Sequence, residues 1–569
     1  MKSPYPSIPT RPIENLRSML DDSVRLFPLR PAFHLRTDEG DFEQISYTRL
    51  REEIDLLGSA LDECGLTGRR IAVIGENCYG WALSYLTVVC GGGVVLPLDR
   101  ELCGEEIGRI CQVAKVDAIL HGASIADRIA AAPLPKETVR IGFDALPLLI
   151  ERGRELLLQG REGYLLAPIE PDALSVLLFT SGTTGVSKGV MLSQRNLCYT
   201  IEQCSKMIAV SEQDLLLSVL PLHHTYECTI GFLLPLYHGA SIAYAERLST
   251  VARDLRQVQA TAMICVPLLL ESFLKKIWQS AEKSGKVDKL RAAIALNRKC
   301  KRVGLDLSRS LFSELRKSFG GRLRLLVSGG AAAKPEVLSG LRELGLTAIQ
   351  GYGLTECAPL TTVNPEKAAK DASAGLCLPD SALRIADPDE NGIGEICYRG
   401  ENVMLGYYEN PSLTAEVIRD GWFHTGDLGF LDPEGYLFIT GRKKNVIVTR
   451  GGKNVFPEEI EEHLCRNEFI AEAMVVGEEE EDDVVIKAYL YPDPDRIAPL
   501  LREGGLEGSE PEARQLIRSL LEKQVIQVNR SLSSYKRIRR IVVRSEPFEK
   551  TSTRKIRRAA AENRAEGED

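Results

Sequence analysis

Hydrophobic residues in the first hundred positions follow helical spacing in some stretches and form short strand-like runs in others. Leu50–Cys64 is apolar at every third or fourth position and ends at a glycine, which predicts an amphipathic helix; Ile13–Leu26 shows a similar pattern. Arg70–Gly75 and Gly93–Leu98 predict buried strands, and Trp81–Val89 between them predicts a buried helix. Strand, helix and strand in this order indicate layered α/β structure.

The stretch Leu177–Leu197 joins a strand pattern to a run of small polar residues. Ser175–Phe179 is apolar and too short for a helix, and a second apolar run leads to Ser193, a plausible N-cap. Between the two runs lie Lys188 and a set of residues without large side chains: Thr180, Ser181, Gly182, Thr183, Thr184 and Gly185. Backbone N–H groups and hydroxyls donate hydrogen bonds to a polyanion, and the lysine supplies positive charge. A glycine-rich hairpin without a ligand is the alternative, but the many hydroxyls and the lysine favour a phosphate site.

Two common nucleotide motifs do not account for this loop. A Walker loop requires G-x-x-x-x-G-K-[ST], whereas here the two glycines are three residues apart and Lys188 precedes a glycine. No G-x-G-x-x-G follows a predicted strand, so a Rossmann dinucleotide site is unsupported. The loop closely resembles the pattern [ST]-[SG]-G-[ST]-T-G-x-[PS]-K-G of the adenylate-forming superfamily, which includes acyl-CoA synthetases, adenylation domains and firefly luciferase.

Composition narrows the class of protein. The chain has 569 residues, too many for one core, and a net charge of −8, which argues against a nucleic-acid binder. No apolar signal segment is visible at the start, and the longest apolar stretch, Tyr85–Leu98, is broken by glycines and falls short of the roughly 20 residues that a membrane helix needs. The 14 cysteines include no C-x-x-C pair. We therefore expect a cytoplasmic protein with reduced cysteines.

A second motif follows a strand pattern and reads Gly351-Tyr352-Gly353-Leu354-Thr355-Glu356. Glycines let a ligand approach the backbone, Tyr352 offers a flat face for a base, and Thr355 offers a hydroxyl. A carboxylate beside a triphosphate would repel it unless a cation lay between them, so Glu356 predicts Mg²⁺. A tight turn with an exposed glutamate is the alternative.

Two adjacent histidines, His223 and His224, follow another strand-like run, Leu215–Leu222. They raise the question of a metal site, but Cys or Asp ligands at useful spacing are missing. Neighbouring side chains on an extended segment also point in opposite directions. A metal ligand role is therefore disfavoured. In the superfamily this P-L-x-H segment lines the acyl pocket, and His224 matches its histidine.

A third motif, GWFHTGDL, places Asp427 in what we expect to be a glycine-bounded turn. By itself Thr-Gly-Asp is an everyday turn. The resemblance implies that Asp427 binds the ribose, that Arg442 reaches ribose and phosphate, and that Lys444 is a hinge between domains.

The resemblance extends to the end of the chain. It implies that Gly451 and Gly452 lie against CoA. Near the end, K-T-S-T-R-K-I matches the terminal motif of the superfamily and places Lys555 on its catalytic lysine, with Arg554 in place of the usual glycine. Six consecutive acids, Glu478–Asp483, predict a solvated surface loop.

The resemblance covers residues from about 40 to 558 and implies a complete set of site residues. The implied catalytic residues are Lys555, Glu356 and His224, and the implied metal ligands are Thr180 and Glu356. The implied nucleotide and CoA contacts are Thr180, Ser181, Gly182, Thr183, Thr184, Gly185, Lys188, Gly330, Ala331, Gly351, Tyr352, Gly353, Thr355, Asp427, Arg442, Lys444, Gly451 and Gly452.

The implied fold is α/β, with a large N-terminal multi-subdomain α/β adenylation domain (residues 1–441) and a small mobile α+β C-terminal domain (residues 442–569). The implied reaction uses ATP, Mg²⁺ and CoA. A carboxylate attacks the α-phosphorus of ATP, and CoA then attacks the acyl-adenylate, which releases AMP.

Likeness to bacterial long-chain synthetases around SGGAAAKPEV and GYGLTECAPL favours a medium- or long-chain fatty acid as substrate. An enzyme that loads an acyl carrier protein, an aryl or amino-acid adenylating enzyme, and a catalytically inactive binding module are the alternatives. We expect no nucleic-acid partner and at most peripheral membrane contact.

Overall fold

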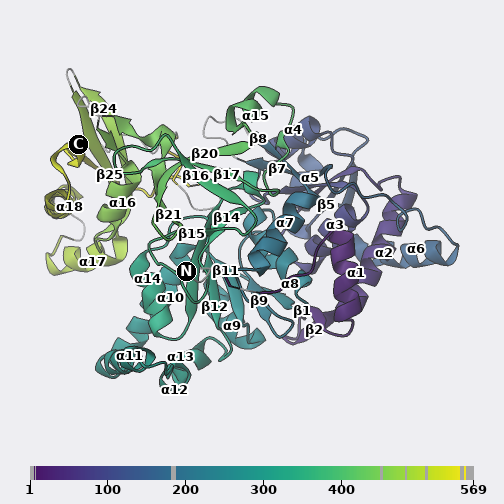
Figure 1. The fold of residues 1–569 in the computed structure, drawn as a ribbon, viewed down its shortest axis with the longest axis horizontal. Helices are drawn as coiled ribbons and strands as arrows, with labels where there is room; N and C mark the ends of the chain where they lie inside the picture. Colours follow the sequence, from purple (N-terminus) through teal and green to yellow (C-terminus); the bar gives the residue numbers. More distant parts are fainter. Residues whose placement is uncertain are drawn as a thin grey trace.

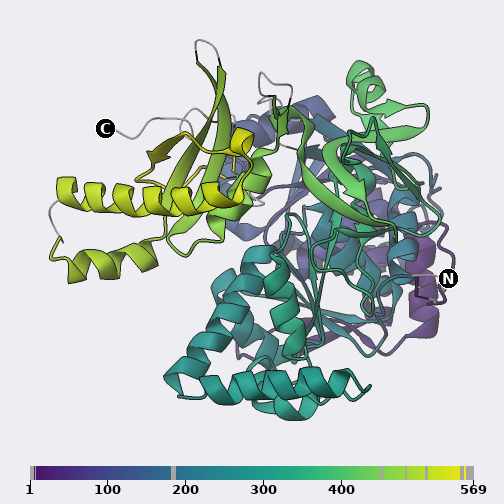
Figure 2. The same cartoon turned by 60° about the vertical axis from the view of Figure 1, so that its left-hand side comes forward.

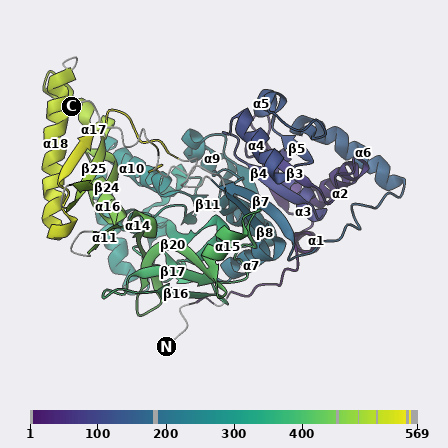
Figure 3. The same ribbon diagram turned by 90° about the horizontal axis from the view of Figure 1, so that it is seen from above.

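The computed structural model describes residues 5–6, 8–180, 188–448, 453–480, 483–506, 510–550, 556–558 and 560. Two large sheets lie side by side in the main body, and a smaller sheet with its own helices lies beside them (Figures 1 and 2). Seen from above, the first part of the chain and the C-terminal part occupy opposite ends of the molecule (Figure 3).

The first sheet has seven strands and carries the serine- and glycine-rich motif. Its central strands are parallel, and β8 and β18 add an antiparallel edge. In spatial order the strands are β18 (Gly406–Tyr407), β8 (Lys188–Ser193), β7 (Leu174–Thr180), β4 (Val94–Leu98), β3 (Arg70–Ile74), β5 (Ala118–His121) and β6 (Val139–Gly142).

The second sheet has fourteen strands, with a parallel centre and antiparallel flanks. Its spatial order is β16 (Ala382–Ala386), β17 (Gly394–Arg399), β20 (Trp422–Leu431), β21 (Tyr436–Arg442), β15 (Gly375–Cys377), β14 (Leu360–Val363), β13 (Thr347–Gly353), β12 (Leu325–Ser328), β11 (Ala262–Cys265), β9 (Leu215–Ser218), β10 (Ser241–Tyr244), β1 (Pro31–Arg36) and β2 (Phe42–Ser46), with β19 (Ile418–Arg419) paired to β20.

Helices cover both sheets (Figure 1). Those of the main body are α1 (Leu16–Leu26), α2 (Tyr47–Glu63), α3 (Tyr79–Cys90), α4 (Gly104–Ala114), α5 (Ala126–Ala131), α6 (Leu146–Leu158), α7 (Gln194–Ser205), α8 (Leu234–Tyr237), α9 (Val251–Val258), α10 (Pro267–Lys283), α11 (Val287–Lys301), α12 (Ser308–Leu311), α13 (Ser313–Ser318), α14 (Pro335–Glu343) and α15 (Pro411–Val417). A π-helix, Tyr226–Leu233, leads into α8.

Local sequence explains several of these boundaries. The Ser193 hydroxyl accepts a hydrogen bond from the Asn196 N–H and caps α7, as predicted. Helix α3 is buried all round from Trp81 to Cys90, because it lies in the core between layers, where Trp81 stacks on Tyr85.

The C-terminal part has a hydrophobic core of its own, formed by buried residues between Ile447 and Ile538. Its sheet contains β24 (Ile470–Glu480), β25 (Asp483–Pro492) and β26 (Arg540–Val543), and β22 (Ile447–Val448) pairs with β23 (Asn454–Val455). Its helices are α16 (Pro457–Cys465), α17 (Pro494–Glu503) and α18 (Glu510–Ser531). A large α/β N-terminal region with a smaller C-terminal domain is the predicted fold class. The boundary after residue 441 stays a prediction.

One local prediction is wrong. The acidic run does not form a loop over its whole length, since Glu478–Glu480 continue β24 and pair with Asp483–Val485 of β25. No helix in the described part of the chain is both long enough and apolar enough to cross a bilayer.

Candidate active site

Three predicted site segments follow parallel strands of the large sheet. β9, β12 and β13 belong to one parallel set, so their carboxyl ends lie along the same edge. The segments 219–224, 329–331 and 354–356 begin at that edge. Ligands of open α/β sheets bind at this edge, which makes it the candidate site.

The phosphate-loop strands form the antiparallel hairpin that the sequence predicts. Thr180 lies opposite Lys188, and its hydroxyl is 3.4 Å from the Lys188 carbonyl oxygen. The intervening predicted residues Ser181, Gly182, Thr183, Thr184 and Gly185 lie outside the described residues. Their contacts with a nucleotide stay a prediction.

Tyr407 contacts both Lys188 and Glu356. The Lys188 ammonium lies 5.2 Å from the centre of the Tyr407 ring, and the Tyr407 hydroxyl donates a hydrogen bond of 2.9 Å to Glu356 Oε1. Burial, and secondarily the Glu356 carboxylate, raise the pKa of Tyr407. Sequence reasoning missed Tyr407, because its two-residue strand carries no motif and is recognised only by its pairing with β8.

A second polar group joins Tyr352, Asp427 and Arg442. The Tyr352 hydroxyl donates to Asp427 Oδ2 at 2.6 Å, and Arg442 Nε lies 2.8 Å from Asp427 Oδ1. Asp427 is only 4% exposed. Burial, and then the Asp427 charge, raise the pKa of Tyr352.

The expected turn at Asp427 is wrong. Asp427 lies within strand β20, directly opposite Arg442 at the end of β21. The left-handed Gly426, with φ +70°, sits inside the strand rather than beside a turn, which is why the Thr-Gly-Asp pattern was misleading.

Several positive charges lie close to one another near these two groups. Lys444 lies in a 3₁₀ turn, Lys443–Asn445, just after Arg442. Burial lowers the pKa of the Lys444 ammonium, and the neighbouring charges of Arg442 and Lys188 lower it further. Such a cluster of cations is suited to an anionic ligand, whose charge would relieve their mutual repulsion.

His223 and His224 depart from the expected geometry. They lie in a turn, not on an extended segment, and their ring centres are 4.1 Å apart instead of on opposite sides. His224 precedes the π-helix, and Tyr226 within it reaches the loop after β12. A Cβ on Gly329 would lie 2.6 Å from the Tyr226 ring, so only glycine fits there.

The other predicted contacts of this edge follow the same strands. Gly330 has φ +80° and Ala331 is exposed, in the loop after β12. Gly351 and Gly353 flank Tyr352 on β13, and Thr355 begins the 3₁₀ turn that holds Glu356. The structure therefore places Gly330, Ala331, Gly351, Gly353 and Thr355 at the carboxyl ends of β12 and β13 or in the segments that follow them. Their contacts with ligands stay predictions.

Glu227 is a buried acid to which sequence reasoning gave no role. It is fully buried in the π-helix, and neither carboxylate oxygen has a hydrogen bond within the described part of the protein. Burial raises its pKa to about 8, and the nearby Ser218 hydroxyl offsets only part of the rise. Burial therefore favours the neutral carboxylic acid form of Glu227 near pH 7.

The donor set near Lys188 fits a magnesium ion shared with phosphates. Mg²⁺ in nucleotide sites is held by one or two carboxylates together with phosphate oxygens and water. Glu356 supplies one carboxylate, and the Thr180 hydroxyl lies at the start of the phosphate loop. Among the described residues, no group of three or more His, Cys, Asp or Glu side chains could enclose a metal without such a ligand. Gly451, Gly452 and Lys555 lie outside the described residues.

Comparison with known proteins identifies the family of this chain. Residues 20–408 match the AMP-binding enzyme family, and residues 444–568 match the AMP-binding enzyme C-terminal domain. Long-chain-fatty-acid–CoA ligase 1 of Cavia porcellus is 30% identical over 94% of this chain and 82% of its own length. Long-chain-fatty-acid–CoA ligase FadD15 of Mycobacterium bovis is 29% identical over 78% of this chain and 77% of its own length.

Solved structures share the fold. An ATP-bound RpMatB-BxBclM chimera has a TM-score of 0.73 at 24% identity and covers 95% of this chain and 97% of its own. The o-succinylbenzoate CoA synthetase MenE of Bacillus subtilis, in complex with AMP, has a TM-score of 0.72 at 22% identity over 97% of this chain and 99% of its own. With the family matched over both parts of the chain, the protein belongs to the AMP-binding enzymes and, within them, to the acyl-CoA ligases that use ATP, Mg²⁺ and CoA.

Proposed function

We propose that this protein is a fatty acyl-CoA synthetase that activates a medium- or long-chain fatty acid as acyl-adenylate and transfers it to CoA. The observation that supports the proposal is a cluster of cations joined to two polar groups. One group is Tyr352, Asp427 and Arg442, the other is Lys188, Tyr407 and Glu356, and the charges of Arg442 and Lys188 both act on Lys444. The preference for a fatty acid is supported by relatives of about 30% identity that are named long-chain-fatty-acid–CoA ligases.

The first half-reaction forms the adenylate. A carboxylate oxygen bonds to the α-phosphorus of ATP, the bond from that phosphorus to the bridging oxygen breaks, and pyrophosphate leaves. Lys188 and the Lys444–Arg442 pair stabilise the negative charge on the phosphates, and Asp427 orients the ribose. Mg²⁺, held by Glu356, neutralises phosphate charge when it is bound.

The second half-reaction makes the thioester. The CoA sulfur bonds to the acyl carbon, the bond from that carbon to the AMP oxygen breaks, and the thiol proton passes to solvent. AMP is the leaving group, so no covalent nucleophile from the protein is required. Lys555 is proposed to act in the first half only, and Lys444 to be the residue about which the C-terminal domain turns between the halves.

A substrate screen tests the proposal. ATP–pyrophosphate exchange is measured with acids that differ in length and polarity: acetate, octanoate, palmitate, malonate, benzoate and o-succinylbenzoate. Palmitate or octanoate is expected to give the fastest exchange, because each methylene buried in an apolar pocket contributes about 0.8 kcal/mol, or roughly fourfold in affinity. Faster exchange with an aromatic or dicarboxylic acid would overturn the fatty-acid assignment.

The acceptor is tested with the preferred acid. Thioester formation with CoA is compared with formation on a phosphopantetheinylated acyl carrier protein. CoA is expected to be the faster acceptor. A carrier protein that is acylated faster than CoA would replace the synthetase proposal with a carrier-loading ligase.

A further inference from the structure

Helices α10–α13 and the turn that leads into β12 carry a charge opposite to that of the whole protein. Residues 271–324, here named the basic segment, contain 15 Lys and Arg residues against 5 Asp and Glu residues. Its net charge is therefore +10 in a chain whose total is −8. Figures 1 and 2 show these helices projecting together from one end of the main body.

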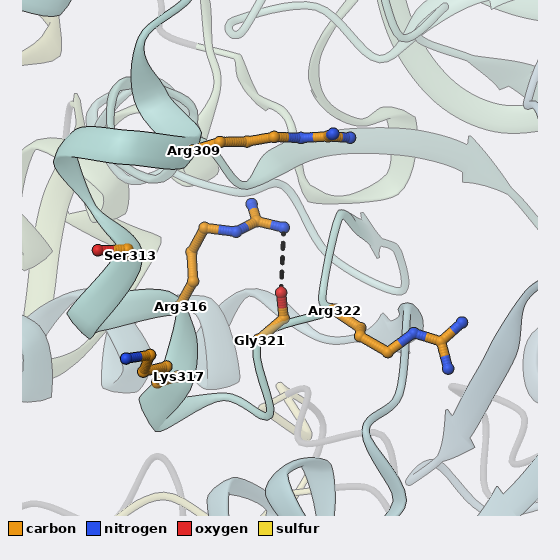
Figure 4. Close-up of a pocket in the computed structure, with 6 residues that line it drawn as sticks. All are labelled: Arg309, Ser313, Arg316, Lys317, Gly321 and Arg322. Atoms are coloured by element: carbon orange, nitrogen blue, oxygen red, sulfur yellow. Dashed lines mark hydrogen bonds between the residues drawn. The ribbon is translucent and has the colours of Figure 1, made fainter.

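Part of this charge surrounds a hollow of about 490 Å³ at the surface. Its walls are Arg309, Ser313, Arg316, Lys317, Gly321 and Arg322, and none of them is acidic. Figure 4 shows the side chains of Arg309, Arg316 and Arg322 extending in the same direction. The Arg316 guanidinium donates hydrogen bonds to the Gly345 and Gly321 carbonyl oxygens, and these bonds fix its position.

Arg309 lies close enough to Arg316 for their charges to repel each other. Burial lowers the pKa of the Arg316 guanidinium, and the nearby Arg309 lowers it further. Guanidinium groups that share a hollow with no acidic lining residue form a site for an anion that offers several oxygens. A phosphate group has that chemistry.

An apolar tip stands beside these cations. The turn between α11 and α12 exposes Val303 by 74% and Leu305 by 59% on either side of the left-handed Gly304. Arg302 precedes the tip and Arg309 lies four residues after Leu305, whereas Lys301 forms a 3.5 Å ion pair with Asp306, the residue after Leu305. Exposed aliphatic side chains flanked by cations suit the interface of a bilayer, where acyl chains and headgroup phosphates lie within a few ångströms of each other.

We propose that the basic segment docks the enzyme on membranes that contain anionic phospholipids, with the arginine-lined hollow binding a lipid phosphate and the Val303–Leu305 tip entering the bilayer interface. A nucleic acid would also satisfy the cations, but it would leave the aliphatic tip in water. The combination therefore favours a lipid surface. Such docking would bring the enzyme to the phase in which long fatty acids dissolve, and it goes beyond the proposed reaction.

Vesicle flotation tests the proposal without any catalytic step, so its result is independent of the proposed function. The full-length protein is mixed with vesicles of pure phosphatidylcholine or of 70% phosphatidylcholine and 30% phosphatidylglycerol in 0.1 M KCl. Binding to the anionic vesicles is expected to be at least tenfold tighter and to disappear in 1 M KCl, where charges are screened within about 3 Å. Equal binding to the two vesicles, or binding to neither, would overturn the proposal.

Two double variants locate the surface. Arg309→Gln with Lys317→Gln should weaken binding to anionic vesicles about 25-fold, since each basic residue near an anionic membrane contributes about fivefold. Val303→Ser with Leu305→Ser should weaken it at least tenfold. Arg109→Gln with Lys136→Gln, which removes two exposed cations elsewhere in the chain, should change it less than twofold.

Circular dichroism and thermal unfolding confirm that each variant is folded. If the double substitution at Arg109 and Lys136 weakens binding as much as the double substitution at Arg309 and Lys317, the attraction is general and the hollow is not the site. If a poly(U) oligonucleotide binds tighter than the vesicles, and the serine variant leaves that binding unchanged, the basic segment is a nucleic-acid surface instead.

Discussion

Replacing Tyr352 by phenylalanine removes one hydroxyl from the polar group around Asp427 and keeps the ring. The hydroxyl donates a 2.6 Å hydrogen bond to a carboxylate that is 4% exposed, and Arg442 Nε holds the other oxygen at 2.8 Å. In the variant, Asp427 therefore keeps its contact with Arg442 and loses the hydrogen bond from residue 352. Because the ring is unchanged, packing around β13 should survive.

A hydrogen bond to a charged group contributes about 1.5–3 kcal/mol, which corresponds to roughly 10- to 150-fold in an equilibrium or rate ratio. We expect kcat/KM for ATP in pyrophosphate exchange to fall by that factor, because the carboxylate that is proposed to bind the ribose loses one of its two contacts. The KM for the fatty acid should change less than twofold. Exchange is measured over a range of ATP concentrations at saturating acid, and then over a range of acid concentrations at saturating ATP.

Tyr164→Phe is the matched control, since Tyr164 is also buried and donates to the Thr87 carbonyl far along the chain from the site. It should lower stability by about 1 kcal/mol without changing the kinetics for ATP. In the Asp427→Asn background, Tyr352→Phe should add less than threefold, since the two residues act together. A folded Tyr352→Phe enzyme with unchanged kcat/KM for ATP, or with the loss confined to the fatty acid, would refute the assignment of Asp427 to the nucleotide.

Three further variants test other residues. Lys555→Ala should abolish most adenylation but leave thioester formation from supplied acyl-adenylate intact, because the charge of Lys555 is proposed to act only while pyrophosphate leaves. Pyrophosphate exchange and thioester yield measure the two steps. Lys444→Pro should separate the two half-reactions in the same two assays, since proline restricts φ at the proposed hinge. Glu227→Gln should flatten the pH dependence of unfolding by urea. The folded chain keeps the Glu227 proton between pH 4.5 and about 8 whereas the unfolded chain loses it, so wild-type stability should fall across that window by up to about 1.4 kcal/mol per pH unit.

Each of these three predictions is contradicted by a particular result. Equal losses in both half-reactions would remove the assigned role of Lys555. A folded Lys444→Pro enzyme that keeps or loses both activities together would place the hinge elsewhere. If wild type and Glu227→Gln show the same slope of stability against pH, the Glu227 carboxyl is not the group that titrates.

The sequence predicted the elements whose signals are local. Helix α2 begins at Tyr47 and ends at Glu63, close to the predicted Leu50–Cys64, because its buried face repeats every three or four residues. The strands on either side of the phosphate loop were found because each is a short continuous apolar run. Ser193 was recognised as a cap from its own chemistry. Such features depend on residues within a few positions of one another.

The errors and omissions depend on partners far along the chain. Asp427 lies in a strand because Arg442 and β17 pair with β20, and neither pairing can be read from Thr-Gly-Asp alone. Tyr407 joins the site only through its pairing with β8, more than 200 residues earlier. Glu478 was expected in a loop because it is acidic, yet its ion pair with the buried Lys487 lets it continue the strand.

The proposed function requires that the protein activate its acid by adenylation. The direct measurement is the identity of the nucleotide products when purified enzyme is incubated with ATP, palmitate, CoA and either Mg²⁺ or EDTA, followed by anion-exchange chromatography. If adenylation occurs, AMP, pyrophosphate and palmitoyl-CoA form in equal amounts, and they form only when Mg²⁺ is present. ADP and orthophosphate as the products would contradict it.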